Sequence, residues 1–248
     1  MPSAPWTPRH TAAALAGGHL LIAGAPGTGK SRLLNGTLLP ALVRAGDPLL
    51  VIQDPATGHG PTLGLRAATL GREAAVGDLL ARPTLVTFTG THPEREAQAE
   101  RLFADLPAAL AAAPAPAGTR RFLVIDVAPL TPALRSFAPL LRQARSLGCT
   151  LIVTCQSPSS LEPGLPALFT SHVAFYHFYK RCLRVMAENV LAATGAEETN
   201  PSGKPTPINR FGQPLATPAS RMVGKLGDLK VGECFLVTPG APYEPLRT

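Results

Sequence analysis

Residues 24–31 read GAPGTGKS and match the pattern G-x-x-x-x-G-K-[ST]. Glycines at these positions let backbone N–H groups surround phosphate oxygens, and a helix N-terminus directly after them favours a bound anion. In such a loop Lys30 reaches the β- and γ-phosphates, and the Ser31 hydroxyl ligates Mg²⁺. The spacing therefore predicts a nucleoside triphosphate site. The residues expected to line it are Gly24, Ala25, Pro26, Gly27, Thr28, Gly29, Lys30, Ser31 and Arg32.

The second part of such a site is an acidic side chain at the end of an apolar strand. Residues 120–126, RRFLVID, supply four apolar positions followed by Asp126. An aspartate there can hold Mg²⁺ through a water molecule, although a strand-end aspartate can also simply cap the next turn. We therefore assign the metal site to Ser31 and Asp126, and count Lys30 and Asp126 as catalytic residues.

A further apolar strand follows the aspartate, and it ends in polar residues. Residues 150–156 read TLIVTCQ, which places Gln156 at the tip of this strand. A glutamine there can orient an attacking water molecule or respond to the γ-phosphate; the alternative is a solvated loop side chain. No guanine-recognition pattern of the N-K-x-D type occurs. The expected ligands are therefore ATP and Mg²⁺, with Gln156 as a third catalytic residue.

The strands that must position these residues are indicated by short apolar segments. Most of them are continuous apolar runs, which is typical of strands buried on both faces of a parallel sheet. Strands are predicted at residues 20–23, 49–53, 84–88, 122–125, 150–154, 172–178 and 232–240.

Helix signals separate these strands. One helix should begin in the GTGKS turn and close near Gly46, with Pro40 causing a kink or an early end. Others are predicted to begin at 91–94 with Leu102, Leu106 and Leu110 on one face, to run from 131 to Gly148, and to cover roughly 180–194. Alternating strands and helices predict an α/β protein with a mainly parallel wound sheet flanked by helices. With the phosphate loop, this is a P-loop NTPase fold of the additional-strand type.

The chain has 248 residues, of which 45% are hydrophobic and 16% charged, enough apolar material for a sizeable core. We expect an ATPase core over residues 1–198. Residues 199–231 are expected to form a proline-rich excursion that faces DNA or a partner. Residues 232–248 then return to the same domain as a final strand and tail.

The net charge of +7 favours polyanionic partners, although a generally basic protein would show the same surplus. The first residues, MPSAPWTPRH, lack the pattern of a secretory signal. No apolar stretch reaches the roughly 18–20 residues that span a bilayer. We therefore expect a cytoplasmic protein with no membrane span of its own.

Residues 140–161, LLRQARSLGCTLIVTCQSPSSL, resemble the FtsK/HerA superfamily of DNA-pumping ATPases. In that superfamily an arginine-bearing helix, an R-S-x-G turn, an apolar strand and a T-Q-x-P ending recur in this order. Residues 49–58, LLVIQDPATG, and the segment 172–195 are similar to other parts of it. The resemblance covers roughly residues 15–195 and the strand GECFLV, and it implies an ATP-hydrolysing motor.

One position departs from this family. Its members usually carry D-E at the end of the aspartate strand, with the glutamate activating water, whereas this chain has Asp126 followed by Val127. Asp54 is the tentative replacement base, because it ends a strand that could lie beside the Asp126 strand. Glu162 is a second option, and ordinary ion pairing is the alternative for both.

The resemblance also implies a ring in which a neighbouring subunit supplies an arginine finger to the γ-phosphate. Each candidate could equally be a solvated charge on a helix face. The candidates are Arg142, Arg145, Arg181 and Arg184.

The expected nucleic-acid partner is double-stranded DNA. A translocating motor grips the phosphate backbone and needs no sequence-reading motif, and the sequence contains none. Basic residues on pore-facing loops would suffice, and the alternative is that these charges serve solubility. The candidates are Arg66, Arg72, Lys204, Arg210 and Arg221.

Within the superfamily, a compact chain of this kind resembles the genome-packaging ATPases of tailless icosahedral viruses with an internal membrane. That resemblance implies a capsid or membrane protein at a viral vertex as partner, and a location in the host cytoplasm or with the virion. The alternatives are a cellular, plasmid or filamentous-phage translocase or assembly ATPase of the same superfamily. Two less favoured alternatives are a small-molecule kinase and a nucleotide-gated scaffold, the latter supported by Val127 alone.

Overall fold

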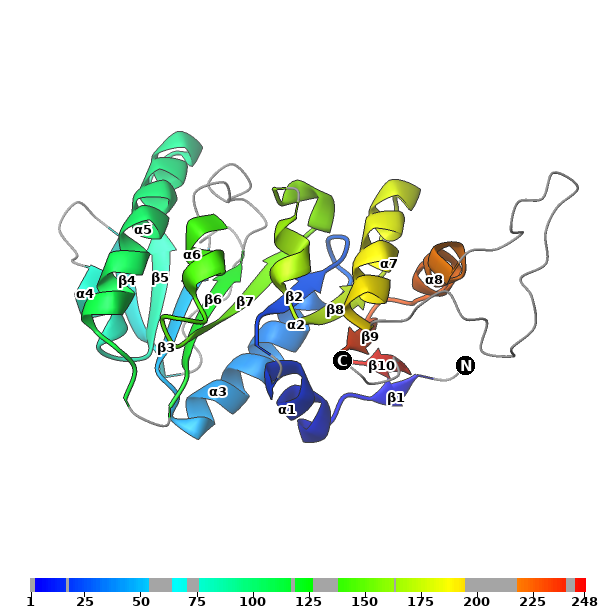
Figure 1. Ribbon diagram of the computed structural model, residues 1–248, viewed down its shortest axis with the longest axis horizontal. Coiled ribbons are helices and arrows are strands. Elements are labelled where there is room, and N and C mark those ends of the chain that lie inside the picture. The colour runs from blue at the N-terminus through cyan, green and yellow to red at the C-terminus, as the bar shows by residue number, and fades with distance from the viewer. Residues whose placement is uncertain are drawn as a thin grey trace, which may run out of the picture.

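The computed structural model describes residues 3–16, 18–53, 64–70, 76–116, 119–126, 138–162, 164–194, 218–239 and 244–248. Within them, ten strands form one sheet with helices on both faces (Figure 1). The order across the sheet is β1-β10-β9-β8-β2-β7-β6-β3-β5-β4. The strands are β1 (Ala4–Pro5), β2 (Leu20–Ala23), β3 (Leu49–Gln53), β4 (Arg66–Leu70), β5 (Thr84–Phe88), β6 (Arg121–Asp126), β7 (Cys149–Cys155), β8 (Ser171–Phe175), β9 (Glu233–Val237) and β10 (Glu244–Arg247).

The seven strands from β8 to β4 in this order run parallel to one another. β9 is antiparallel to both β8 and β10, and β1, which pairs with β10, is the edge strand on this side. β7 lies between β2, which precedes the GAPGTGKS loop, and β6, which ends at Asp126. The predicted mainly parallel sheet with an additional strand at this place is confirmed.

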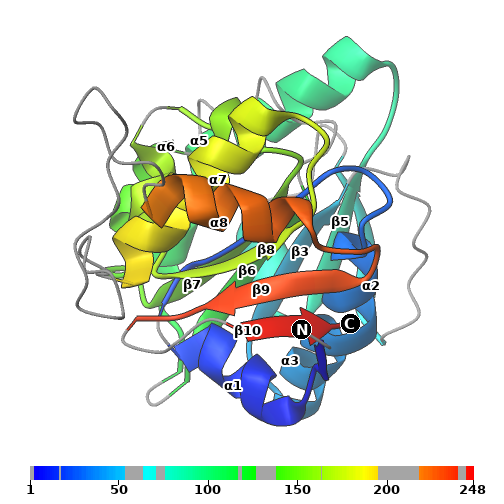
Figure 2. The same cartoon turned by 90° about the vertical axis from the view of Figure 1, so that its right-hand side faces the viewer.

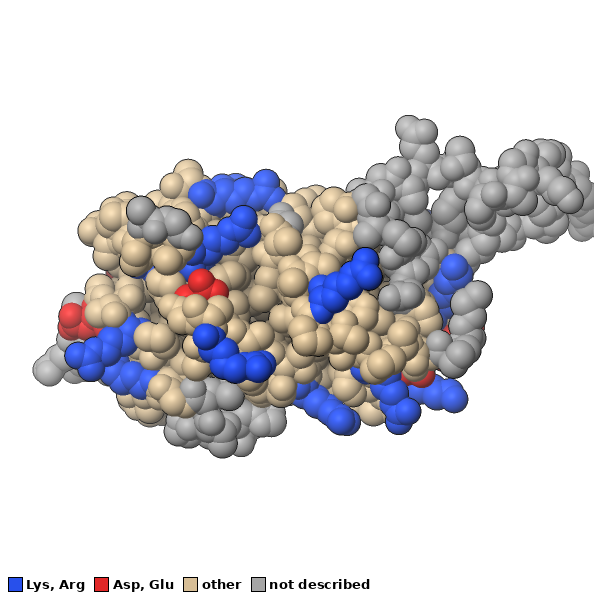
Figure 3. Space-filling view, turned by 90° about the horizontal axis from the view of Figure 1, so that it is seen from below, with Lys and Arg blue, Asp and Glu red and all other residues tan. Residues whose placement is uncertain are grey.

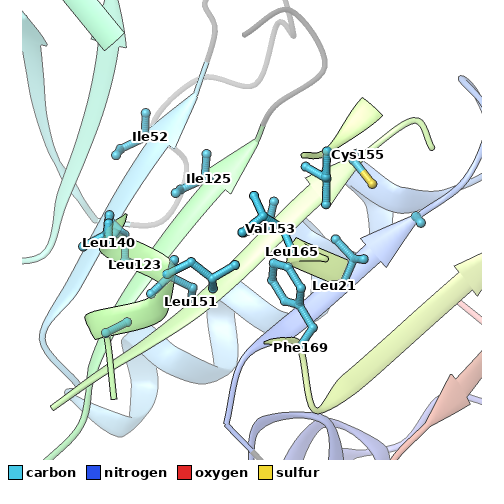
Figure 4. Packing of buried hydrophobic residues seen from close by; sticks show 14 of the residues in the cluster. Leu21, Ile52, Leu123, Ile125, Leu140, Leu151, Val153, Cys155, Leu165 and Phe169 are labelled. Carbon is cyan, nitrogen blue, oxygen red and sulfur yellow. The ribbon is translucent and has the colours of Figure 1, made fainter. Parts of the chain in front are cut away.

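Alternate residues of the central strands enter two hydrophobic cores, one on each face. Leu20 and Ile22 of β2 pack with the helices on one face, and Leu21 and Ala23 pack with those on the other. Figure 4 shows the second core, in which Val153 and Phe169 lie near Leu21. Because both faces are covered, these strands read as continuous apolar runs.

The helix that follows the GAPGTGKS loop consists of three consecutive pieces. They are α2 (Lys30–Leu33), a π-helical turn η1 (Leu34–Leu38) and α3 (Leu39–Ala45), which ends at Gly46 with a φ of 73°. Pro40 lacks an N–H and would crowd the preceding turn of a regular α-helix. The wider π-turn just before it accommodates the ring. Of the two predicted outcomes, an early end does not occur, and the helix is instead interrupted by this π-turn.

Most of the remaining helices cover the opposite face of the sheet. α5 (His92–Ala112) begins with a capping box between Thr91 and Glu94 and buries the three predicted leucines. The predicted helix from residue 131 is described only as α6 (Ala138–Gln143), and the turn after it reaches Gly148, where φ is 64°. α7 (Lys180–Thr194) matches its predicted range.

Several elements were not predicted from the sequence. They are α1 (Pro8–Ala16), β1, β4, α4 (Val76–Leu80), the 3₁₀ turns η4 (Pro158–Ser160) and η5 (Leu165–Leu168), α8 (Pro218–Gly227) and β10. α8 belongs to the segment 199–231 and lies beside α7 (Figure 2), with Met222 and Leu226 buried. Part of the predicted excursion therefore contributes to the core.

Two predicted strands are shorter than expected. β8 ends at Phe175 and not at residue 178, although the backbone N–H of Ala25 still donates a hydrogen bond to the carbonyl of Tyr176 (3.0 Å) just beyond it. β9 covers Glu233–Val237 within the predicted range 232–240. No helix among the described residues has both the length and the apolar character that a membrane crossing requires.

Candidate nucleotide site

The GAPGTGKS loop joins β2 to α2 at the carboxyl edge of the sheet (Figure 1). Three backbone hydrogen bonds hold it there. Gly24 donates to the carbonyl of Cys155 at the end of β7 (3.3 Å). Ala25 donates to Tyr176 beyond β8 (3.0 Å), and Thr28 accepts from Gly232 before β9 (3.0 Å). The loop is therefore fixed by strands on both sides of β2.

Two glycines of the loop are required by close packing. A Cβ atom at Gly24 would lie 2.5 Å from Cβ of Phe175. Gly29 has a φ of 114°, a conformation that favours glycine, and a Cβ there would lie 3.3 Å from both the Phe175 ring and the Thr248 hydroxyl. Phe175, which is fully buried, thus packs against the loop at both glycines.

The ammonium group of Lys30 lies inside the loop. Its Nζ donates hydrogen bonds to the carbonyls of Gly24 (2.7 Å) and Ala25 (2.8 Å). Burial lowers the pKa of Lys30, and the neighbouring Cys155 and Asp126 side chains act in the opposite direction. The charge of Asp126 therefore acts on Lys30, while the assignment of the two residues to one nucleotide site stays a prediction.

Asp126 is the last residue of β6 and is only 5% exposed. Its Oδ1 accepts a hydrogen bond from the hydroxyl of Thr154 on β7, its direct neighbour in the sheet register. Its Oδ2 is buried and has no hydrogen-bond partner in the described part of the chain. An unpaired, buried carboxylate oxygen is costly unless a ligand or water completes it.

Gln53 lies on the other side of Asp126, as the last residue of β3, and was not predicted as a site residue. The two residues are paired in the parallel register, so their side chains lie on the same face of the sheet. Gln53 is 5% exposed, and its Nε2 also lacks a partner within the described residues. A polar residue ending an otherwise apolar strand was the available signal.

His177, just beyond β8, is a second functional candidate that was missed. It is 5% exposed, and the backbone N–H of Tyr179 donates to its Nδ1 (3.1 Å). Burial lowers the pKa of His177, and the positive charge of Lys30 lowers it further. The lone histidine carried no pattern in sequence, because its proximity to Lys30 arises from strand order.

The other predicted catalytic residues are less closely placed. Gln156 is exposed, two residues beyond Thr154. Glu162 is exposed and forms an ion pair with Arg142 (3.4 Å). Asp54 and Val127 lie outside the described residues, so the tentative base stays a prediction; the residue before Asp54 does pair with Asp126.

The four arginine-finger candidates are dispersed over the chain. Arg142 pairs with Glu162, and Arg184 pairs with Glu188 on α7 (2.9 Å). Arg181 is exposed on the same helix. Arg145 lies beside Gly18 and His19 at the amino end of β2, opposite the phosphate loop. A role in a neighbouring subunit stays a prediction for all four.

Of the residues suggested to contact DNA, Arg66 is exposed on the edge strand β4 and donates to the carbonyl of Asp78 (2.8 Å). Arg221 belongs to α8, and Arg72, Lys204 and Arg210 lie outside the described residues. On the face in Figure 3, Lys and Arg side chains are more numerous than Asp and Glu.

The oxygen atoms at the site suit Mg²⁺, which prefers hard oxygen ligands and retains several waters. Two oxygen atoms are available as metal ligands. They are the buried, unpaired Oδ2 of Asp126 and the hydroxyl of the partly exposed Ser31 at the start of α2. Among the described residues, no group of three or more His, Cys, Asp or Glu side chains gathers into a metal centre.

A phosphate loop after β2, an aspartate ending β6 and an additional strand between them define the fold of an additional-strand P-loop NTPase. No protein-family model matches the sequence, and no curated protein matches it. Comparison with solved structures finds several proteins of similar fold.

The genome-packaging NTPase B204 from Sulfolobus turreted icosahedral virus 2, in complex with AMPPCP, superposes with a TM-score of 0.57 at 14% identity, covering 89% of this chain and 91% of B204. The plasmid coupling protein TrwB, bound to a GTP analogue, superposes with a TM-score of 0.59 at 13% identity, covering 100% of this chain and 89% of TrwB. The cytoplasmic domain of the type VII secretion ATPase EccC of Thermomonospora curvata superposes with a TM-score of 0.51 at 19% identity, covering 93% of this chain and 25% of the EccC chain. The predicted resemblance to FtsK/HerA-type ATPases in fold is therefore confirmed.

Proposed function

We propose that this protein is an ATP-hydrolysing motor that moves double-stranded DNA, and that its task is to package a viral genome into a preformed capsid. The observation that carries the proposal is the placement of Lys30 and Asp126 at one edge of the sheet, on either side of the additional strand β7. That arrangement is the one required to hold a nucleoside triphosphate with its metal.

Binding would require a rearrangement of Lys30. Its ammonium group now contacts the carbonyls of Gly24 and Ala25, and it exchanges these contacts for β- and γ-phosphate oxygens when ATP enters. Backbone N–H groups of the loop and the N-terminus of α2 surround the remaining phosphate oxygens. Ser31 and Asp126 would hold Mg²⁺, and the bound ion would supply positive charge that offsets the negative charge of the phosphates.

Water must be positioned on the γ-phosphate side of the loop. Gln53 Nε2 and Asp126 Oδ2 are buried and unpaired there. The hydrogen bond from Thr154 orients the Asp126 carboxylate. We assign Gln53 to positioning the water shell and Gln156 to sensing the γ-phosphate. Asp54, which directly follows Gln53, remains our proposed base, because Val127 cannot accept a proton.

The assignment to DNA packaging rests on two kinds of support. The fold is similar over about nine tenths of both chains to B204, which is described as a genome-packaging NTPase, and the net charge of +7 suits a polyanionic substrate. TrwB and EccC share the fold and are described as a coupling protein and a secretion ATPase. We further propose a homo-oligomeric ring, recruited by a capsid or membrane protein at a viral vertex.

The decisive experiment is steady-state ATP hydrolysis with and without long double-stranded DNA, with Lys30→Ala as the control. We expect stimulation by DNA of any sequence that falls with rising salt and is lost in Lys30→Ala. Turnover that ignores DNA, or no turnover at all, would contradict the motor and favour the kinase or scaffold alternatives. Phosphate transfer to a small acceptor would establish the kinase.

A further inference from the structure

Three large apolar side chains stand out among the described residues because they are exposed. Phe178 is 66% exposed, Tyr179 is 70% exposed and Val231 is 76% exposed. All three lie just outside the sheet at its carboxyl edge, Phe178 and Tyr179 after β8 and Val231 before β9. We call these three residues the apolar rim.

The apolar rim is tied directly to the phosphate loop. Tyr176, which accepts a hydrogen bond from Ala25, precedes Phe178 by two residues and Tyr179 by three, a reach of at most about 7–11 Å. On the other strand, Gly232 donates to Thr28, and Val231 is the residue before it. β8 and β9 are neighbours, with Phe175 paired to Cys234, so both parts of the rim occupy one corner of the molecule.

The order of the strands determines which end of a nucleotide would meet this corner. β7 and then β6 lie on one side of β2, whereas β8 and then β9 lie on the other. A triphosphate with its γ-end toward Asp126 on β6 points that end away from β8 and β9. Its opposite end, which carries the sugar and the base, therefore extends toward Phe178, Tyr179 and Val231.

We propose that Phe178 and Tyr179 form a stacking surface for the nucleobase of the bound nucleotide, with Val231 at its edge. A nucleobase is a planar aromatic group, and it stacks on exposed aromatic rings whichever base it is. The inference rests on the proposed nucleotide site, and it adds the subsite that distinguishes a nucleotide from a bare polyphosphate.

Each of the two exposed rings contacts the ring of the residue two positions before it. Phe178 contacts Tyr176 edge-to-face, with ring centroids 5.2 Å apart and an angle of 86°. Tyr179 lies 5.6 Å from the His177 ring, and its backbone N–H bonds to His177 Nδ1. His177 is itself buried, and the positive charge of Lys30 lowers its pKa, so the aromatic pair lies within electrostatic range of the phosphate end of the site.

The test compares a ligand that has a base with one that lacks it. Binding of MgATP and of magnesium tripolyphosphate is measured by calorimetry for the wild type, Phe178→Ala, Tyr179→Ala and the double variant. We expect each single variant to weaken MgATP about tenfold, the size of one base stack, and to leave tripolyphosphate binding unchanged. The matched controls Phe178→Trp and Tyr179→Phe keep a ring and should retain MgATP affinity.

Other results would overturn the inference. Unchanged MgATP affinity in the double variant, or an equal loss for both ligands, excludes a base-stacking role. Weakened self-association, measured by sedimentation, with an unchanged ratio of the two affinities would instead assign the rim to a subunit contact. If wild type and Lys30→Ala bind neither ligand, the proposed nucleotide site itself fails, a result distinct from failure of the rim alone.

Discussion

The hydroxyl of Thr154 on β7 donates a hydrogen bond to Oδ1 of Asp126 on β6. The additional strand thus does more than separate the phosphate loop from the aspartate strand, because it supplies the group that orients the carboxylate. Oδ2 is left without a partner among the described residues and is the oxygen available to a metal or its water.

Replacing Thr154 by valine should therefore weaken the metal site while preserving shape. Groups that orient metal ligands typically contribute about 10–100-fold to metal affinity, so we expect the Mg²⁺ concentration for half-maximal ATP hydrolysis to rise by roughly that factor. Thr150→Val is the matched control, since Thr150 is also buried and lies near the other end of β7. An unchanged Mg²⁺ dependence in Thr154→Val would show that this hydrogen bond has no part in metal binding.

Gln53→Leu should separate activity from stability. The variant removes a buried amide whose Nε2 has no partner within the described residues, so the free energy of unfolding should stay constant or rise. If Gln53 positions water, kcat should fall about tenfold or more, with little change in MgATP affinity. Thermal unfolding and single-turnover hydrolysis measure the two effects. A parallel loss of stability and activity would mark Gln53 as structural.

Alanine at Gly24 should disrupt the phosphate loop, whereas alanine at Gly36 should not. The new methyl at Gly24 would meet Phe175 at 2.5 Å, an overpacking that typically costs about 1–3 kcal/mol. Nothing lies within 4 Å of the corresponding position at Gly36, in the helical turn η1, where alanine should stabilise by roughly 0.5–1 kcal/mol. Urea unfolding and MgATP binding are measured for both variants, Gly24→Ala and Gly36→Ala. Normal nucleotide binding by Gly24→Ala would contradict the packing argument.

Acid should destabilise the fold through two buried histidines. Burial lowers the pKa of His19 to about 4, with a contribution from Arg145, and burial likewise lowers the pKa of His172 to about 4. Because the folded pKa lies below the unfolded value of about 6.5, the unfolded chain binds protons first as the pH falls. Each of the two histidines should therefore lower the free energy of unfolding by about 2 kcal/mol between pH 7 and pH 5.

Urea unfolding at several pH values measures that loss, and NMR titration of the two imidazoles locates their pKa values. A stability that stays level from pH 7 to pH 5, or imidazoles that titrate near pH 6.5, would show that these histidines are not held neutral by the fold. The hydrogen bond from the backbone N–H of Leu151 to His19 Nδ1 (3.1 Å) is the contact that protonation of this atom would break.

The parts of the protein that were predicted correctly depend on short stretches of sequence. The phosphate loop, the helix after it and the apolar strands all follow from residue types at close spacing. Pro40 shows the limit of such local reasoning, since a π-turn just before it lets the helix continue. β4 and α8 were missed because their few apolar residues gain meaning only when they pack on β5 and α7.

The residues around the phosphate loop come from segments far apart in the chain. Lys30, Asp126 and Ser31 could be named in advance, because each belongs to a recognisable local pattern. Thr154, Gln53 and His177 were not named, because the order of β3, β6, β7, β2 and β8 in the sheet brings them to the loop; of the three, Gln53 alone carried a local signal as a polar residue ending an apolar strand. That order is decided by long-range packing of two apolar faces, which no local pattern records, and it alone places the polar strand ends beside the loop and the exposed aromatic rings on its other side.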